Sequence, residues 1–379
     1  MAGRWSTTLP DDLILEIGQC FLATNDLDAY VDFRRACSDW HRAIPNPKVD
    51  AMDPKFLPSK WVMAKHSVFE DDKVTFVNLS TGRSICKTIS HVLRRYSLVG
   101  VMTGGLFVLR EKEEPREIQV LNPFTGAIVH FKAGIPWETV EAVAVTLSPM
   151  RVFATCPQSH RVRWIDEDSK KSTSGWNIQD GWGFQDKSFG PSPWYGCLIS
   201  MTPFAGDVYT TNSGGSIISA THAAAAEKDQ REQLPAILGP ESYGQVLRGN
   251  YFYLVESQEE LLFVIDRRLL YYKGGPLVYK LDAVNKGLVP VWSIGSHALF
   301  VGQCRCLSVD ASNLQTIDAG SIYYADYSTI MAYDYETLPD GDWVEAEAEH
   351  VVEFEPNRGG YCRPFSLAQI LVDYCRSGY

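Results

Sequence analysis

The chain has 379 residues, of which 45% are hydrophobic and 21% are charged. This balance is ordinary for a folded protein and excludes a mainly disordered or collagen-like chain, and the length suits one large or two unequal domains. The net charge of −11 leaves no broad basic face for a phosphate backbone, which argues against nucleic acid as a general partner.

The cysteines and the first residues predict an intracellular protein. Nine cysteines form an odd set without a regular disulfide framework, and no Cys-x-x-Cys pair supports a zinc site. The first residues lack the apolar core of a signal peptide, and no segment approaches the roughly 18 consecutive apolar residues of a membrane helix. We therefore expect a cytoplasmic or nuclear protein with no metal, no cofactor and no membrane partner.

The N-terminal region predicts three short helices. Pro10 suits the opening turn of the first helix, and the acidic pair that follows it, beginning with Asp11, favours the positive end of the helix dipole. Leu13, Ile17 and Phe21 then recur every four residues and share one face.

The second and third helical patterns follow directly. Asn25 or Asp26 can cap the second helix. Apolar residues then recur at steps of three, four and three and predict one continuous stripe, formed by Tyr30, Phe33, Cys37 and Trp40. A segment of about 40 residues is too short to bury these side chains by itself, so a partner or a neighbouring domain has to cover them.

From about Trp61 the pattern changes to short strand-like runs separated by glycine and polar turns. Two of the turns are related by a repeat of 44 residues, because the pattern Asn78-x-x-Thr81-Gly82 recurs as Asn122-x-x-Thr125-Gly126. Two further steps of 44 reach Asp166 and Thr210, where we again expect apolar residues followed by a polar turn.

A period of about 40 to 50 residues with several strands per repeat is typical of a β-propeller. About 320 residues at this period predict six or seven blades. The Gly-Gly pairs are spaced irregularly and no Trp-Asp dipeptide closes a blade, so the kelch and WD patterns do not fit. We therefore expect a small all-α N-terminal module followed by an all-β domain.

Residues 5 to 45 resemble the F-box, in the order Leu9-Pro10-x-Asp12-Leu13-x-x-Glu16-Ile17, Asp26-Leu27-x-Ala29 and Phe33-Arg34-x-Ala36-Cys37-x-x-Trp40. F-boxes are carried by substrate-recognition subunits of SCF (Skp–cullin–F-box) ubiquitin ligases. The resemblance implies that Trp40 packs the module itself. It implies helix-in-groove contacts to a Skp-family adaptor from Leu9, Pro10, Leu13, Ile17, Leu27, Tyr30 and Phe33.

The body resembles the KIB-type β-propeller over about residues 60 to 355, on the short motifs VLNPFTG, GSHALFVGQCRCLSVDA and SIYYADY. This domain follows the F-box in many plant proteins. Together the two resemblances imply a plant F-box protein, non-catalytic itself, that reaches cullin through the adaptor and holds an unknown target protein on the propeller. They divide the chain into an F-box at 5–47, a linker at 48–59 and a propeller at 60–379.

The strongest candidate for target binding is the aromatic segment 174–196, SGWNIQDGWGFQDKSFGPSPWYG. Its composition is typical of a long loop, and its large aromatic side chains are of the type that anchors protein interfaces, namely Trp176, Trp182, Trp194 and Tyr195. The alternative is that these side chains fill the gap between neighbouring blades.

Two other segments have a helical pattern. Residues 221–236 predict a short surface helix or an insertion, and Leu367, Leu371 and Tyr374 can line one face of a helix within 360–379. The sequence does not decide whether that C-terminal helix docks on the body or on the F-box.

No catalytic motif stands out, since the hydrolase elbow, the zincin motif, the P-loop and the dinucleotide-binding glycine pattern are all absent. His297 lies among apolar residues, which predicts a hydrogen-bonded core or turn histidine. Two alternatives stay open. One is a carbohydrate-binding or glycoside-processing propeller with a structural helical head. The other is an F-box protein that sequesters its partner without degradation.

Overall fold

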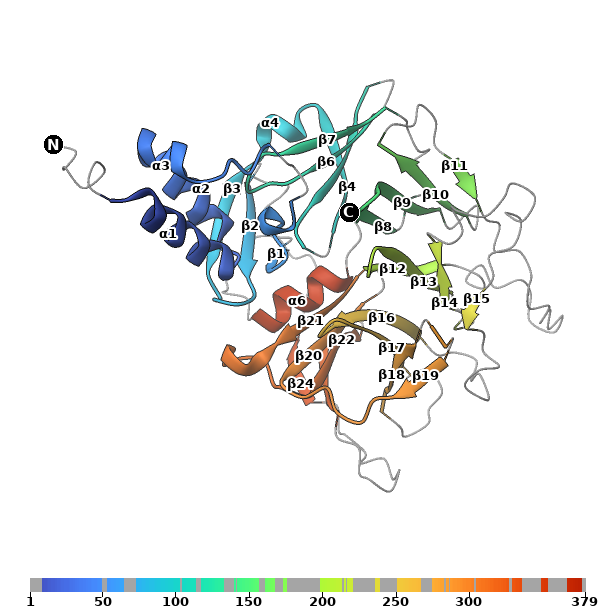
Figure 1. Cartoon of the computed structure of the whole chain (residues 1–379). Coiled ribbons are helices and arrows are strands. Elements are labelled where there is room, and N and C mark those ends of the chain that lie inside the picture. Colours follow the sequence, from blue (N-terminus) through green and yellow to red (C-terminus); the bar gives the residue numbers. More distant parts are fainter. Residues whose placement is uncertain are drawn as a thin grey trace, which may run out of the picture. The chain divides into compact units, whose positions relative to one another are not determined.

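The structure is a computed structural model, and contacts divide it into two compact units, unit 1 (Met1–Gly134) and unit 2 (Ile135–Tyr379) (Figure 1). It describes residues 9–49, 53–64, 73–102, 104–113, 117–132, 140, 142–156, 161–167, 173–175, 198–212, 215, 217–220, 236–238, 251–266, 275–282, 284–285, 287–302, 305–326, 329–335, 349–353 and 367–376.

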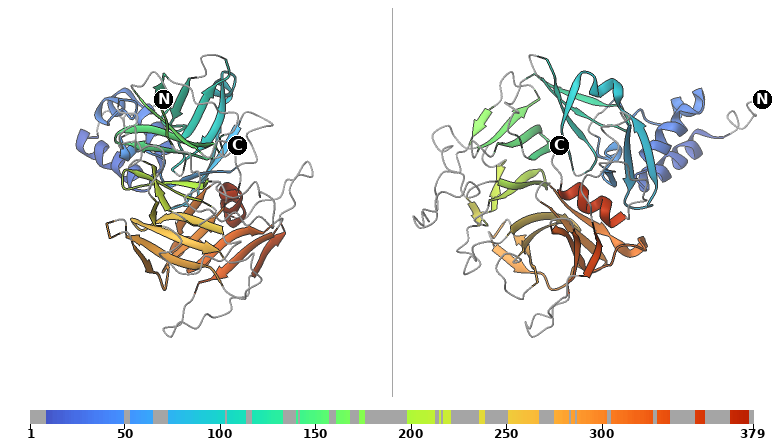
Figure 2. Two further views of the ribbon diagram at one scale, coloured as in Figure 1. Left: turned by 90° about the vertical axis from the view of Figure 1, so that its right-hand side faces the viewer. Right: turned by 180° about the vertical axis from the view of Figure 1, so that it is seen from behind.

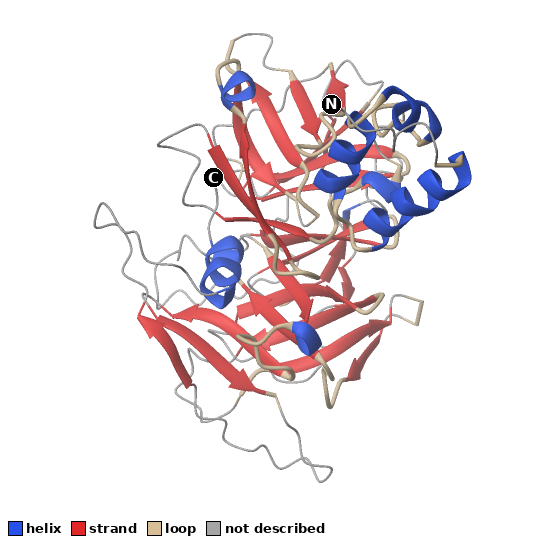
Figure 3. Ribbon diagram, turned by 90° about the vertical axis from the view of Figure 1, so that its left-hand side faces the viewer, coloured by secondary structure: helices blue, strands red, loops and turns tan. Residues whose placement is uncertain are grey.

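Unit 1 begins with the three expected helices, α1 (Asp11–Ala23), α2 (Leu27–Arg35) and α3 (Ser38–Ala43), drawn in blue in Figure 3. Helix α1 starts directly after Pro10, whose backbone is extended. Of the two candidate caps for α2, Asp26 is the one used, because its carboxylate accepts a hydrogen bond from the Ala29 backbone N–H at 3.2 Å. The segment predicted as a linker contains the 3₁₀ turn η1 (Pro54–Phe56), and Phe56 is buried.

The prediction of one continuous apolar stripe from Tyr30 to Trp40 is wrong. Helix α2 ends at Arg35, and Cys37 adopts an extended conformation as the N-cap of α3. The chain direction therefore changes inside the stripe, and the side chains at its two ends pack in different places. A spacing of three and four residues indicates a common face only while one helix continues.

The strands of unit 1 form two antiparallel sheets, of order β1-β2-β3 and β4-β5-β6-β7. The short helix α4 (Ser90–Leu93) connects them. The strand bounds are β1 (Trp61–Ala64), β2 (Lys73–Asn78), β3 (Ser84–Thr88), β4 (Tyr96–Val101), β5 (Phe107–Glu111), β6 (Ile118–Leu121) and β7 (Ile128–Phe131). Buried aromatic rings fill the interior, with the Phe124 centroid 4.8 Å from that of Trp61 and 4.9 Å from that of Phe76.

The two turns related by the 44-residue repeat have the same atomic structure. In each, the asparagine carboxamide oxygen accepts backbone N–H bonds from the second and third residues further on, at 2.9 and 3.2 Å for Asn78 and at 3.0 and 3.2 Å for Asn122. The turns close at Gly82 and Gly126, whose φ angles of +67° and +70° are left-handed values that glycine adopts without strain. The repeat predicted for this pair is confirmed.

The later steps of the repeat hold less well. Asp166 ends β10 (Arg161–Asp166), the third strand of its sheet, just as Asn122 follows the third strand β6. Thr210, however, lies inside β13 (Asp207–Asn212) and pairs with Met201 and Ile218, so a turn that begins at Thr210 is wrong, whereas Ser213 lies outside the described residues. An equal step along the sequence fails once the intervening loops differ in length.

Unit 2 continues with antiparallel sheets whose strands follow chain order, β8-β9-β10-β11, β12-β13-β14-β15 and β16-β17-β18-β19 (Figure 2). A five-stranded sheet of order β21-β20-β22-β23-β24 differs by the parallel pairing of β20 with β22. The remaining strand bounds are β8 (Ala142–Leu147), β9 (Met150–Cys156), β11 (Thr173–Gly175), β12 (Leu198–Phe204), β14 (Ile217–Ser219), β15 (Ala236–Leu238), β16 (Tyr251–Ser257), β17 (Glu260–Asp266), β18 (Leu277–Asp282), β19 (Gly287–Pro290), β20 (His297–Val301), β21 (Cys306–Asp310), β22 (Ser321–Asp326), β23 (Thr329–Asp334) and β24 (Glu349–Glu353).

Helix α6 (Leu367–Arg376) packs against β20, β21 and β22, so the predicted C-terminal helix docks on the strand-rich body. Leu371 and Tyr374 are fully buried there, and the Arg305 side chain fixes the end of the helix by donating to the Tyr374 carbonyl oxygen at 2.9 Å. A second short 3₁₀ turn, η8 (Ala311–Asn313), follows β21.

Candidate functional site

Asn25 fixes the turn between α1 and α2 against the first sheet of unit 1. Its side-chain nitrogen donates to the Leu57 carbonyl oxygen at 2.8 Å, and its side-chain oxygen accepts from the Lys60 backbone N–H at 3.0 Å. The Asn25 backbone carbonyl accepts from the Trp61 indole N–H at 2.6 Å. Both Asn25 and Trp61 are buried, so the three helices are joined to the strands by buried hydrogen bonds.

Charged and amide side chains extend this junction along β2 and β3. Asp26 and Arg83 form an ion pair at 2.5 Å, and Asp28 and Lys87 form another at 2.5 Å. The side-chain nitrogen of Asn78, the first residue of the repeat turn, lies 3.3 Å from the carbonyl oxygen of Thr24 and donates a hydrogen bond to it. Thr24 is the C-cap of α1. The repeat turn that begins at Asn78 therefore has a second role, because it binds the α1–α2 turn through Asn78 and Arg83.

Leu27 and Tyr30, two of the residues expected to contact an adaptor, face the interior of unit 1. Leu27 is 0% exposed and Tyr30 is 1% exposed. The Tyr30 hydroxyl donates to the Pro45 carbonyl oxygen at 2.9 Å, and its ring centroid lies 5.4 Å from that of Phe56. Burial raises the pKa of Tyr30 to about 12. A partner cannot reach these two side chains, so the expected contact set has to exclude them.

The outer side of α1 keeps apolar surface exposed. The Leu13 side chain is 43% exposed, and it lies one helical turn before the half-buried Ile17. Leu15, 37% exposed, lies on the other side of the buried residue Ile14. We call the apolar row on the Leu13 side of the helix the α1 face. It consists of Leu9, Pro10, Leu13 and Ile17.

Phe33 and Trp40 connect α2 to α3. Their rings stack with centroids 4.3 Å apart and an angle of 30°, and the Phe33 ring also lies 5.5 Å from that of Phe21 in α1. The Trp40 indole N–H is buried and has no hydrogen-bond partner among the described residues. Phe33 itself is half-buried, so it holds the three helices together and offers a partner only part of its ring.

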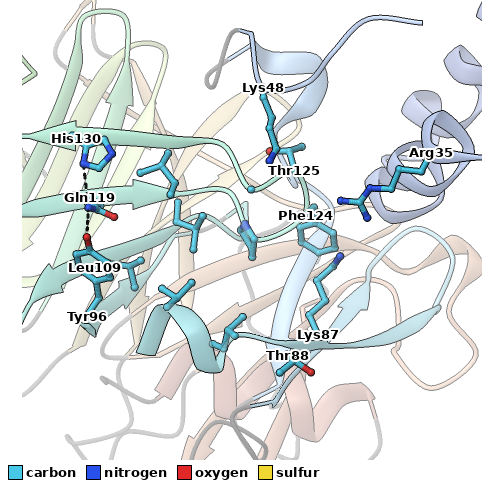
Figure 4. A pocket seen from close by; sticks show the side chains of 16 residues that line it. Arg35, Lys48, Lys87, Thr88, Tyr96, Leu109, Gln119, Phe124, Thr125 and His130 are labelled. Atoms are coloured by element: carbon cyan, nitrogen blue, oxygen red, sulfur yellow. Dashed lines mark hydrogen bonds between the residues drawn. The ribbon is translucent and has the colours of Figure 1, made fainter. Parts of the chain in front are cut away.

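A pocket of about 560 Å³ lies within unit 1 (Figure 4). Among the described residues, three lysine or arginine side chains line it, Arg35 from α2, Lys48 from the segment after α3 and Lys87 from β3, and no acidic side chain of that part of the chain does. Arg35 and Lys87 point toward the ring of Phe124, whereas Lys48 reaches the second repeat turn beside Thr125, and the Lys87 ammonium is 5.2 Å from the ring centroid.

The other end of the pocket is closed by a hydrogen-bonded row of polar side chains. The Gln119 side-chain nitrogen donates to the Tyr96 hydroxyl at 2.7 Å and lies 3.1 Å from His130 Nδ1, as the dashed lines in Figure 4 show. Gln119 is 4% exposed, whereas Tyr96 is half-buried and His130 is exposed. Apolar side chains of β5 and β6, Leu109 and Leu121, line the pocket between the two ends.

This pocket could not be predicted from the sequence. Its basic residues lie far apart in the chain and none belongs to a motif, whereas Phe124 was visible only as part of the repeat Asn122-x-x-Thr125-Gly126. The residues expected to bind a target, Trp176, Trp182, Trp194 and Tyr195, lie outside the described residues, as do residues 221–235. His297 is the first residue of β20, and its Nδ1 lies 2.8 Å from the Gln258 side-chain nitrogen, as expected for a hydrogen-bonded histidine.

Nowhere in the described part of the chain do three or more His, Cys, Asp or Glu side chains gather as a ligand set for a metal ion. Its helices are all too short or too polar to cross a membrane.

Up-and-down sheets of four strands in chain order, together with a docked helical module, define a strand-rich protein of the β-propeller type. Residues 69–347 match the model of the KIB1-4 beta-propeller family, and the chain therefore belongs to that family. The match confirms the KIB-type resemblance of the body. Helices α1–α3 precede the matched range, so the F-box resemblance stays a prediction.

Three similar solved structures are distant likenesses. A catalytically inactive virginiamycin B lyase from Staphylococcus aureus with quinupristin has 12% identity and a TM-score of 0.30, covering 76% of this chain and 88% of the lyase. A protein of unknown function from Bacteroides thetaiotaomicron has 11% identity and a TM-score of 0.29, covering 70% and 64%. The designed protein Ika8 has 9% identity and a TM-score of 0.30, covering 70% and 65%. A search of curated proteins gave no match.

Proposed function

We propose that this chain is the substrate-recognition subunit of an SCF-type ubiquitin ligase. In this proposal the α1 face binds a Skp-family adaptor, which links the chain to cullin, and the propeller of six or seven blades holds a target protein. The chain carries out no chemistry itself, and it accelerates ubiquitin transfer by bringing the target close to the conjugating enzyme.

One observation carries the proposal. Leu13 stays 43% exposed although its neighbour Ile14 on the same helix is buried, and Pro10 beside it is also exposed. A row of apolar side chains left uncovered on a short helix is typical of a surface that a groove in another protein covers. The F-box resemblance of residues 5 to 45 supplies the class of that partner.

The helices do not need the adaptor in order to stay attached to the body. Hydrogen bonds of Asn25 and ion pairs of Asp26 and Asp28 already join them to the first sheet. The adaptor would therefore bind a preformed surface, which lowers the ordering entropy that binding has to overcome.

The first test compares two leucines of the same helix. Leu13→Asp places a charge in the α1 face, whereas Leu15→Asp places the same charge at a comparably exposed position on the other side of α1. With the full-length chain and a purified Skp-family adaptor, we expect Leu13→Asp to weaken binding by about tenfold or more and Leu15→Asp by less than about twofold. Binding is measured by isothermal titration calorimetry.

If the adaptor binds both variants as tightly as the unmodified chain, the α1 face is not the adaptor-binding surface. Equal weakening by the two substitutions would also count against it, because a charge anywhere on α1 would then be enough. Reconstitution with cullin and a RING subunit tests the ligase role separately, by ubiquitination of a protein that co-purifies with the full-length chain.

A further inference from the structure

The pocket of unit 1 is lined by basic side chains, although the chain as a whole is acidic. The whole chain has a net charge of −11, yet the described residues that line the pocket include Arg35, Lys48 and Lys87 and no acidic side chain. Arg35 has only a weak ion pair, at 3.7 Å to Asp32, in which both side chains are 70% exposed. Lys48 has no ion pair among the described residues. The pocket therefore retains a positive potential toward its opening.

We propose that this pocket binds a small organic anion, an apolar or aromatic body that carries one phosphate, sulfate or carboxylate group. The inference does not depend on the proposed ligase role. It rests on the arrangement of the basic side chains, on the apolar lining and on the size of the cavity.

The anionic group would sit at the Phe124 end. The Lys87 ammonium lies 5.2 Å from the Phe124 ring centroid and is already held in place by Asp28 at 2.5 Å. The Lys48 ammonium lies directly over the second repeat turn, since a β carbon added to Gly126 would be only 3.5 Å from it. In Figure 4 the Arg35 side chain reaches toward the Phe124 ring from α2, so all three cationic side chains lie at this end of the pocket.

The apolar body would lie along the floor of the pocket. Leu109 and Leu121 are buried below it, and Ile89 and Val92 extend the lining on the α4 side. A volume of about 560 Å³ falls within the range of roughly 300 to 1,000 Å³ that is usual for small-molecule sites. An inorganic anion alone would leave this apolar surface uncovered.

Binding would also couple the helices to both sheets of unit 1. The lining residues come from α2, from the segment after α3, from β3 and from the strands and turn of the second sheet. A ligand that touches all of these binds the assembled unit only, and it therefore stabilises the helical module in place.

Calorimetry on the full-length chain with three probes tests the proposal. Phenyl phosphate combines a ring with an anion, inorganic phosphate supplies the anion alone, and benzyl alcohol supplies the ring alone. We expect saturable one-to-one binding of phenyl phosphate that is about tenfold tighter than that of inorganic phosphate, because the ring adds buried apolar area. Benzyl alcohol should bind more weakly than phenyl phosphate.

Two double variants with the same change in net charge locate the site. Arg35→Gln/Lys48→Gln removes two pocket cations, and Arg42→Gln/Lys60→Gln removes two exposed cations that do not line the pocket. The pocket variant should weaken phenyl phosphate binding by about tenfold and the control by less than about twofold. Equal weakening by the two would overturn the proposal, as would the absence of saturable binding to the unmodified chain.

Ile128 offers a test in the other direction. It lines the pocket and is 43% exposed, so it can be replaced without disturbing the interior. Ile128→Lys should tighten phenyl phosphate binding and Ile128→Glu should weaken it, whereas Leu13→Asp on the α1 face should leave it unchanged. If a glutamate-rich peptide displaces phenyl phosphate and binds more tightly, the pocket serves an acidic protein segment and the small-anion proposal is wrong.

Discussion

Asn25 combines two properties that the junction in unit 1 requires. Its φ of +54° turns the chain sharply between α1 and α2, and asparagine adopts this conformation more readily than most residues. Its buried carboxamide then pairs with both the Leu57 carbonyl and the Lys60 N–H. Glycine would allow the turn without the hydrogen bonds, and alanine would supply neither.

Asn25→Gly should therefore destabilise the chain less than Asn25→Ala. Asn25→Gly should lower the free energy of unfolding by about 1–3 kcal/mol, because two partly buried backbone groups lose their partner. Asn25→Ala should cost about 1 kcal/mol more, from its strain at positive φ. Urea denaturation of the full-length chain, followed by tryptophan fluorescence, measures both. The exposed Asn313→Ala is the control, and an Asn25→Ala variant as stable as Asn25→Gly would contradict the proposed strain.

At the scale of elements, the repeat turns make a paired prediction. Gly82→Ala and Gly126→Ala should each destabilise the chain by about 1–2 kcal/mol, because both glycines have left-handed φ values. Gly287→Ala in β19 is the matched control, since a β carbon there meets nothing within 4 Å and the φ is not left-handed. It should change stability by less than about 0.5 kcal/mol. Thermal unfolding of the three variants gives the comparison, and equal losses would show that φ is not the cause.

The sequence predicted what depends on neighbours in the chain. The three N-terminal helices and the Asn78 and Asn122 turns follow from local spacing and capping. The prediction from sequence failed where residues far apart in the chain determine which side chains are buried and which are in contact. The helical pattern placed Tyr30 on an apolar face, but only η1, with Phe56, makes that face interior. Nor could spacing show that Lys87 meets Asp28, 59 residues away, or that it shares a pocket with Arg35.

For the whole molecule, the family match and the compact units divide the chain differently. The match begins at residue 69, whereas unit 1 joins α1–α3 with the first two sheets up to Gly134. Trp61 precedes the matched range, yet it is fully buried, and its indole bonds to the α1–α2 turn. The predicted boundary between residues 47 and 60 therefore cuts through a packed region, and the helical module serves as part of the structural support of the body.

Deletion of residues 1–52 tests this integration. The deletion leaves the Trp61 indole, the Asn78 amide and the Lys60 N–H without their partners in the α1–α2 turn and uncovers Phe56. We expect its thermal midpoint to fall by at least about 5 °C and its exposed apolar surface to bind a fluorescent dye such as 8-anilinonaphthalene-1-sulfonate. Deletion of residues 1–8 is the control, because it removes none of these contacts and should shift the midpoint by less than about 1 °C. If the chain of residues 53–379 unfolds at the same temperature as the full-length chain, then the helices are an independent module and the hydrogen bonds of Asn25 contribute nothing to the body. If it unfolds earlier, target binding has to be studied with the full-length chain, and adaptor binding is best abolished by Leu13→Asp, which leaves the junction intact.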